Sequence, residues 1–201
     1  MTTMQQPAQS AAPDAVQTEA HAAPRFALWQ RLLLGVLALL LLIAATYAFA
    51  WFNANRLSQR FMADADANYE QGNYILALTG REAYDPDAQQ YVRTGGYIDV
   101  ERIWSHRRSW PTPAIVEDAR VRAGEIIYLH LTLEEAEGYI QANIGRPAPY
   151  FGEVYLHLGE LYLREGEEEE AREIYESVPQ LFRGRTALIE EAERRLAEMD
   201  E

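Results

Sequence analysis

The feature that most constrains this chain is an apolar run at residues 32–52, which contains no charged side chain. As an α-helix, these 21 residues would measure ~31 Å, about the thickness of the hydrocarbon core of a bilayer. Aromatic side chains flank the run, with Trp29 before it and Trp51 and Phe52 at its end, as at the two headgroup levels of a membrane. The sequence therefore predicts a transmembrane anchor over residues 25–57.

Two other interpretations of this run are a cleaved secretory signal and a buried core helix. A signal has a shorter apolar core followed by small residues, whereas bulky Trp51 and Phe52 end this run. Ala44, Ala45 and Ala48 leave cleavage open as an alternative. A core helix of a soluble protein would carry a polar stripe, which the run lacks. Anchorage is the interpretation that we adopt.

The arginines on the two sides of the anchor nearly balance. Arg25 and Arg31 precede the run, and Arg56 and Arg60 follow it, so the positive-inside count discriminates little between the two orientations. We expect the N-terminus inside and the following domain outside the cell membrane, because an uncleaved N-terminal anchor commonly exports the domain that comes after it.

The run separates a short polar tail from a strongly acidic region. Residues 1–24 are rich in Ala, Gln, Pro and Thr, which predicts a disordered tail. The net charge is −13, and 29 of the 31 Asp and Glu residues follow the run. Such a surface repels the phosphates of nucleic acids and anionic lipids and favours basic partners. The charge therefore argues against nucleic-acid binding.

Several classes of chemistry have no residues to carry them. The chain has no Cys, and all 18 basic residues are Arg, which removes thiolate, disulfide, Schiff-base and P-loop lysine chemistry. The four His include no pair at the spacing of a helical zinc site, and no Ser stands in a nucleophile turn. We therefore predict that the protein is not an enzyme and has no cofactor and no metal; an enzyme with an unrecognised site is the third hypothesis.

Beyond residue 57, helical segments alternate with Gly and Pro, and no run of alternating β-branched residues competes with them. The sequence therefore predicts an all-α domain over residues 58–201.

One segment of this domain has the spacing of a helix–turn–helix unit. Small Gly159 and Ala171 would let two helices approach closely, while Tyr155, Tyr162 and Tyr175 would fill the space around them. Short helix pairs cannot bury their apolar faces alone and usually stack in series. The pattern resembles the tetratricopeptide repeat, a unit of ~34 residues with a turn between its helices.

The same landmarks recur upstream. Gly124 and Ala136 each precede Gly159 and Ala171 by 35 residues, and fainter copies begin near residues 65 and 88. The resemblance implies a tetratricopeptide-like helical-repeat domain, an α-solenoid, after the transmembrane helix. Its best units are residues 117–151 and 152–186, followed by a capping helix at residues 187–199.

In the tetratricopeptide family, the first helices of successive units line a concave groove that binds other proteins. Carried onto this sequence, the resemblance implies a protein-binding groove formed by Asp118, Val121, Arg122, Glu125, Tyr128, Leu129, Glu153, Leu156, His157, Glu160, Leu163 and Arg164. A clamp for a C-terminal carboxylate is not expected, because Val121 and Leu156 replace the basic positions that it needs. Acids outnumber bases in the groove, so we expect it to prefer a basic or mixed-charge segment.

Together these features predict a membrane-anchored protein-interaction scaffold, an accessory or assembly component of a larger membrane protein complex. Its partners would be proteins, with no small-molecule substrate. The alternative is a structural single-helix subunit whose contacts are made by the transmembrane helix, where small residues such as Gly35 allow close packing.

Overall fold

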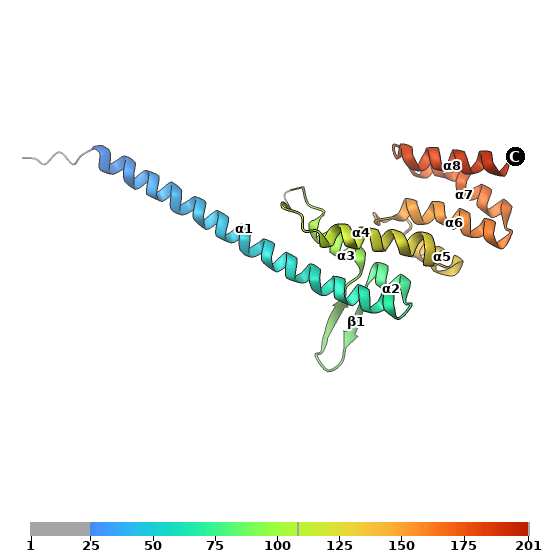
Figure 1. The fold of residues 1–201 in the computed structure, drawn as a ribbon, viewed down its shortest axis with the longest axis horizontal. Helices are drawn as coiled ribbons and strands as arrows, with labels where there is room; N and C mark the ends of the chain where they lie inside the picture. The colour runs from blue at the N-terminus through green and yellow to red at the C-terminus, as the bar shows by residue number, and fades with distance from the viewer. Residues whose placement is uncertain (1–24, 108, 201) are drawn as a thin grey trace, which may run out of the picture. The chain divides into compact units, whose positions relative to one another are not determined.

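The computed structural model describes the backbone of residues 25–107 and 109–200, and side chains from residue 29 onward. The predicted disordered tail, residues 1–24, lies outside the described residues. The described part of the chain is mostly helical (Figure 1) and divides between Tyr47 and Ala48 into two units.

Helix α1 (Arg25–Glu70) contains the whole apolar run. The leucines at residues 32–42 are each more than half exposed, and none of the most apolar window of the helix is buried. Within the described ranges, α1 is the single helix long and apolar enough to cross a membrane. This exposure is compatible with a helix that crosses a membrane once.

The helix continues without a break through residue 58, where the anchor was expected to pass into the domain. From residue 48 onward, α1 belongs to the second unit and packs on it along a stripe with helical spacing. The stripe consists of Trp51, Ser58, Phe61, Met62, Ala65 and Tyr69. The predicted anchor and the second unit therefore share one helix.

Gly95 lets the rest of the domain approach α1 closely. A Cβ atom on Gly95 would lie 2.3 Å from Cβ of Phe61, which no side chain tolerates. The Gly95 backbone N–H donates to Asp64 Oδ2 over 3.0 Å. Glycine is therefore required here for space, and the contact fixes the chain beside α1.

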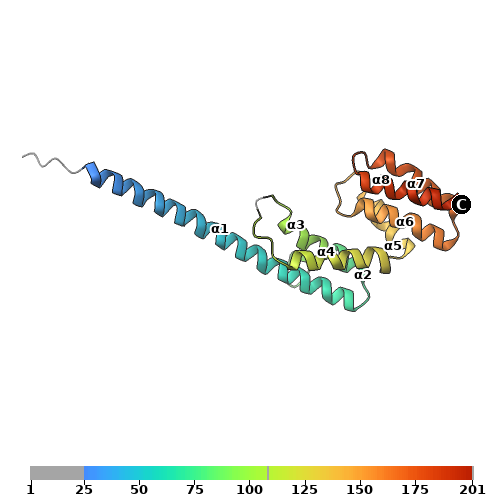
Figure 2. The same ribbon diagram turned by 45° about the horizontal axis from the view of Figure 1, so that its top comes forward.

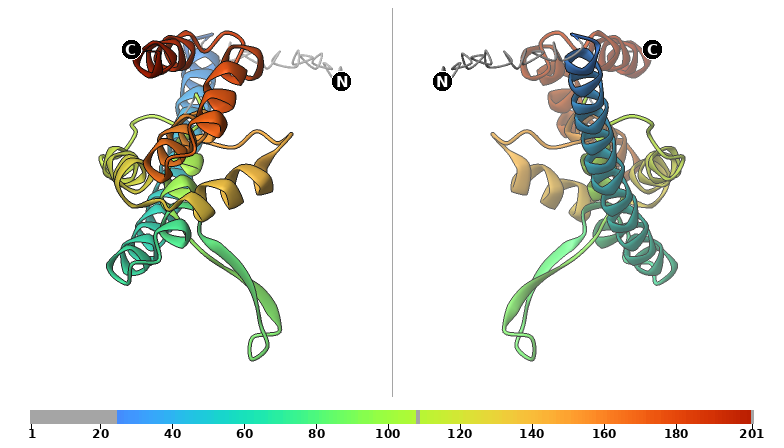
Figure 3. Two further views of the ribbon diagram at one scale, coloured as in Figure 1. Left: turned by 90° about the vertical axis from the view of Figure 1, so that its right-hand side faces the viewer. Right: turned by 90° about the vertical axis from the view of Figure 1, so that its left-hand side faces the viewer.

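The all-α prediction is wrong for residues 81–94. These residues form an antiparallel hairpin of β1 (Arg81–Asp85) and β2 (Gln90–Thr94), which extends away from the helices of the second unit (Figure 3). Tyr84 and Tyr91 pair across the strands and are 54% and 71% exposed. Because both strands are largely exposed, they lack the apolar alternation by which a strand is recognised.

The hairpin turn also lies where a faint, helical copy of the repeat was expected to begin, near residue 88. Oδ1 of Asp85 accepts hydrogen bonds from the backbone N–H groups of Asp87 and Ala88, at 2.9 and 3.1 Å. An aspartate that bonds the backbone ahead of it stabilises a turn in place of a helix. The faint repeat copy near residue 88 is therefore wrong.

Helices α2 (Tyr74–Thr79), α3 (Tyr97–Trp104), α4 (Ile115–Glu125) and α5 (Leu133–Asn143), with the end of α1, enclose the larger core. A π-helix (Ile126–His130) continues α4. The main neighbour of α4 is α3, and the main neighbour of α5 is α6. The two helices of the predicted unit 117–151 thus pack chiefly on other elements.

The π-helix explains why α4 and α5 do not pack on each other as the predicted unit 117–151 requires. The Leu131 N–H donates to the Ile126 carbonyl over 2.9 Å, which widens the last turn, and Leu131 then adopts an extended backbone. Thr132 and Glu135 cap α5 reciprocally, so a new helix begins at once in another direction. Gly124 has open space around its Cα and is therefore not a counterpart of Gly159.

Helices α6 (Phe151–Glu165), α7 (Glu168–Leu181) and α8 (Thr186–Met199) stack in chain order (Figure 1). The left-handed backbone of Gly166, with φ of 83°, ends α6 at the expected turn. The second core lies between these helices and includes Ala171, Tyr175, Val178, Leu188 and Ala192. The predicted capping helix coincides with α8.

Candidate protein-interaction groove

The surface of the second unit is hollowed between the end of α1 and α4. A cavity of about 610 Å³ lies there. Its lining residues are Met62, Asp66, Tyr69 and Glu70 from α1 and Asp118, Val121, Arg122 and Glu125 from α4. We call these residues the acidic groove, because four carboxylates and one guanidinium line it.

Helix α1 supplies one wall of the acidic groove. Its four residues are spaced as one helix face, and two of them are fixed from behind. The Tyr97 hydroxyl of α3 donates to Asp66 Oδ1 over 2.7 Å, and burial together with this bond raises the pKa of Tyr97. The Tyr69 hydroxyl lies 3.2 Å from Nε2 of His130. These contacts hold the wall in place.

Helix α4 supplies the other wall because its two faces differ. Val116, Ala119 and Ala123 are buried in the larger core. The groove residues of α4 occupy the opposite face, where Val121 is 54% exposed. Helix α4 is therefore amphipathic, with its polar face turned toward the groove.

The arginine of the groove is occupied by its own neighbours. Nη1 of Arg122 donates to Glu125 Oε2 over 2.9 Å, and this bond raises the pKa of Arg122. Its Cζ atom also lies 5.1 Å from the centre of the Tyr69 ring, as in a cation–π contact. Glu70 and Asp118 remain exposed on the two walls, so the groove presents a net negative surface.

The π-helix carries the same face of α4 toward α6. Tyr128 and Leu129 are 48% and 72% exposed, and the Tyr128 ring meets the His157 ring edge to face at 5.7 Å. Burial, with the nearby charges of Glu153 and Glu160, raises the pKa of Tyr128. π-turns within helices occur often at functional sites, and here the turn leaves two large apolar side chains at the surface.

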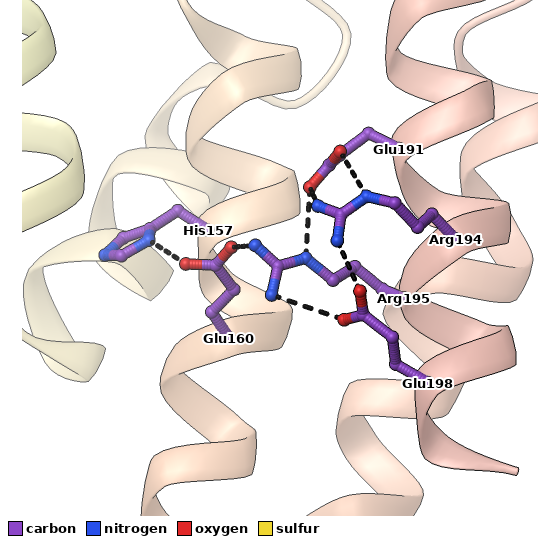
Figure 4. Close-up of polar contacts among 6 residues, drawn as sticks. All are labelled: His157, Glu160, Glu191, Arg194, Arg195 and Glu198. Atoms are coloured by element: carbon purple, nitrogen blue, oxygen red, sulfur yellow. Dashed lines mark hydrogen bonds and ion pairs between the residues drawn. The ribbon is translucent and has the colours of Figure 1, made fainter. Parts of the chain in front are cut away.

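The predicted groove residues on α6 are placed differently from our expectation. His157 is only 1% exposed, and its Nδ1 lies 3.0 Å from Glu160 Oε2. Burial lowers the pKa of His157. Glu160 also binds Arg195 of α8, which in turn contacts Glu191 and Glu198 (Figure 4). Glu160 therefore joins α6 to α8, and His157 presents almost no surface to a partner.

The other predicted residues of α6 divide between structure and surface. Glu153 pairs with Arg185 at 2.7 Å, and Leu156 and Leu163 pack on the second core. Arg164 is exposed at the end of the helix. The α4 half of the predicted groove thus lines a cavity, whereas the α6 half mostly supports the stack of α6, α7 and α8.

Sequence reasoning missed the α1 half of the groove, namely Met62, Asp66, Tyr69 and Glu70. The available signal was their spacing of four, three and one residues, which puts them on one helix face. The long-range pairing of α1 with α4 left no comparable signal in a single sequence.

A second cavity, of about 540 Å³, lies beside α3 and α5. Its charged lining residues are largely engaged: Arg102 pairs with Asp99 at 3.2 Å, and Glu135 caps α5 through Thr132. None of the predicted groove residues lines this cavity.

Within the described ranges, no cluster of His, Asp and Glu is arranged to hold a metal ion. Comparison of the chain with models of protein families, with curated proteins and with solved structures found no match.

Proposed function

We propose that the protein is a membrane-anchored interaction scaffold whose acidic groove binds a basic segment of a protein partner. The observation that carries this proposal is the groove itself, in which Glu70 and Asp118 stand exposed on opposite walls. Met62, Tyr69 and Val121 add apolar surface between the charges. A segment that combines basic and aliphatic side chains complements such a lining.

The membrane anchor in this proposal is the apolar half of α1. Because α1 also forms a wall of the groove, a bound partner would be held within a few helical turns of the bilayer. This supports a role as an accessory or assembly component of a membrane protein complex. The helix pair α6–α7 and the cap α8 support, as a proposal, a tetratricopeptide-like relationship for the end of the domain.

One observation favours a second function. The apolar side chains of α1 are uncovered, and nothing lies within 4 Å of where a Cβ of Gly35 would be. A structural subunit that binds another membrane helix on this small residue would use the same exposure. Gly35→Leu would then abolish association with the complex, whereas changes in the acidic groove would not.

The scaffold proposal is tested with the full chain in nanodiscs of phosphatidylcholine. A fluorescent peptide of alternating arginine and leucine serves as the basic probe, and a glutamate–leucine peptide serves as the acidic one. We expect the basic peptide to bind, and Glu70→Lys with Asp118→Lys to weaken binding roughly tenfold, because each reversal turns an exposed attraction of up to ~1 kcal/mol into a repulsion.

The matched control is Glu173→Lys with Glu190→Lys, which changes the net charge equally at exposed positions of α7 and α8. This control variant should retain most of its affinity for the basic peptide. Equal loss in both double variants would mean that the basic peptide responds only to the overall charge, and the groove assignment would be withdrawn.

A further inference from the structure

The acidic character of the second unit is interrupted beside the end of the apolar run. No Asp or Glu occurs at residues 20–63 or at residues 102–116. The first range includes Arg56 and Arg60 of α1. The second includes Arg107 in the connection between α3 and α4, and Arg108, whose placement lies outside the described residues.

Two contacts bring these acid-free segments together. Nε1 of Trp51 donates to the carbonyl of Pro111 over 2.8 Å, and the Trp51 ring meets Trp104 of α3 edge to face at 5.6 Å. The α3–α4 connection therefore lies beside α1 at the level of Trp51 (Figure 2). This level is where the apolar run ends, and an anchored helix would pass there from hydrocarbon to headgroups.

The side chains at this level suit a lipid headgroup layer. Trp110, next to Pro111, is 77% exposed, and Phe52 is 54% exposed. Cζ of Arg56 lies 6.0 Å from the centre of the Phe52 ring. Tryptophan and arginine are the side chains enriched where protein meets the membrane interface. We call Arg56, Arg60, Arg107 and Trp110 the basic edge.

The arginines of the basic edge are available to a ligand. In the described part of the chain, no carboxylate forms an ion pair with Arg56, Arg60 or Arg107, although the domain is rich in Glu and Asp. By contrast, Arg102, Arg120 and Arg122 of the same region are each paired with a carboxylate.

We propose that the basic edge binds the headgroups of anionic phospholipids and thereby docks the domain on the bilayer surface. The inference rests on the proposed anchorage by α1, which places the edge at headgroup level. Each arginine near an anionic surface contributes about 1 kcal/mol, or about fivefold in the docking equilibrium. The acidic remainder of the domain is repelled by the same surface, so only one face of the domain can approach it.

The absence of cysteine from the chain allows a single label to test this. A nitroxide on Ala114→Cys, an exposed position at the start of α4, reports collisions with a water-soluble reagent. The full chain is compared in nanodiscs of phosphatidylcholine alone and of phosphatidylcholine with phosphatidylglycerol. The reference label is on Gln180→Cys, exposed on α7.

We expect the anionic lipid to shield the label at position 114 and not the label at position 180. Arg107→Gln should lower the ratio of docked to undocked domain about fivefold, and moderate salt should lower it further, because counter-ions screen the surface. The control Arg183→Gln, exposed between α7 and α8, should leave the shielding unchanged.

Flotation of the chain with the lipid after alkaline extraction is measured in parallel. If the chain floats but its labels are equally accessible in both lipids, the docking proposal is overturned and the anchorage stands. The ligand of the basic edge would then have to be an acidic protein. Equal loss of shielding in Arg107→Gln and Arg183→Gln would also overturn the docking proposal. A chain that does not float would overturn the anchorage, and the docking proposal with it.

Discussion

Gly159 of α6 and Tyr175 of α7 are in direct contact, and a Cβ atom added to Gly159 would lie 2.6 Å from Cζ of the tyrosine ring. Tyr175 is fully buried, so its ring cannot move aside into solvent. The two helices therefore approach closely because one of them lacks a side chain where the other places a ring.

Gly159→Ala should destabilise the domain, because even one methyl group overlaps the Tyr175 ring. Overpacking of this kind typically costs about 1–3 kcal/mol. Thermal unfolding of the full chain in detergent, followed by circular dichroism, measures the change. Gly124→Ala is the matched control: its Cβ would meet nothing within 4 Å, and alanine in a helix is favoured over glycine by about 1 kcal/mol. The two substitutions should therefore shift the melting temperature in opposite directions.

The contact between Gly159 and Tyr175 could be predicted from the sequence because it is local. Residues 155–175 form two consecutive helices, so the spacing of small and aromatic residues is enough to pair them. The pairing of α4 with α3 and of α1 with the rest of the domain could not be predicted in this way. It depends on the turn at Leu131 and on side chains such as Trp104 and Ser58, which are 46 residues apart.

The residues of the candidate site also differ in whether the sequence could predict their position. Asp118, Arg122 and Glu125 were named by the resemblance to the repeat, and they line one cavity because they share one face of a single helix. His157 was placed on a surface by analogy with the repeat, whereas burial against Tyr128 and bonding to Glu160 decide its actual position. The hairpin was missed because its strands are exposed and bury almost nothing that would impose a pattern.

Ser58→Ala should loosen the attachment of α1 to the domain. The Ser58 hydroxyl is fully buried and accepts a hydrogen bond of 2.6 Å from Nε1 of Trp104. Removal leaves the indole N–H without its partner, at a cost of about 1–3 kcal/mol. Denaturation followed by tryptophan fluorescence measures the loss. Ser105→Ala, at an exposed serine whose hydroxyl donates to the Arg102 carbonyl, should change the free energy of unfolding by less than about 0.5 kcal/mol.

If Ser58→Ala and Ser105→Ala had the same effect, the buried bond would not be a main attachment of α1. A double-mutant cycle with Trp104→Phe separates the bond from packing. When Trp104 is already phenylalanine, Ser58→Ala should lose most of its effect on the free energy of unfolding, because phenylalanine has no donor for residue 58.

The stability of the domain should fall as the pH is lowered from neutrality, and His157 should contribute to this fall. Burial holds the pKa of His157 in the folded state below its ordinary value of 6.5. Between the folded and unfolded pKa values, the unfolded chain binds more protons, so stability rises with pH in that window and is lost as the pH falls through it. His157→Gln should flatten the dependence just below pH ~6.5.

Glu191 extends the same trend to lower pH. Its hydrogen bond to Arg194 lowers the pKa of the carboxyl, so its contribution is present above the unfolded pKa of 4.5 and is lost as the pH falls through the folded value. In the His157→Gln variant, the free energy of unfolding should therefore still decline below pH ~4.5, where carboxyl groups of the folded state are protonated. A curve that stays flat there would contradict the assignment of Glu191.

The orientation of the anchor gives the last prediction. Four arginines flank the run, two on each side, and the arginines of the α3–α4 connection lie too far along the chain to enter the positive-inside count, which is taken within ~15–20 residues of a span. We expect the domain outside, since an uncleaved N-terminal anchor commonly exports the domain that comes after it. Gln180→Cys should then react with a membrane-impermeant maleimide in intact spheroplasts. Ser10→Cys, in the N-terminal tail, should react only after lysis. The reverse pattern would place the domain inside, where a basic partner segment would have to be sought among cytoplasmic loops, because these are the loops in which arginine and lysine accumulate.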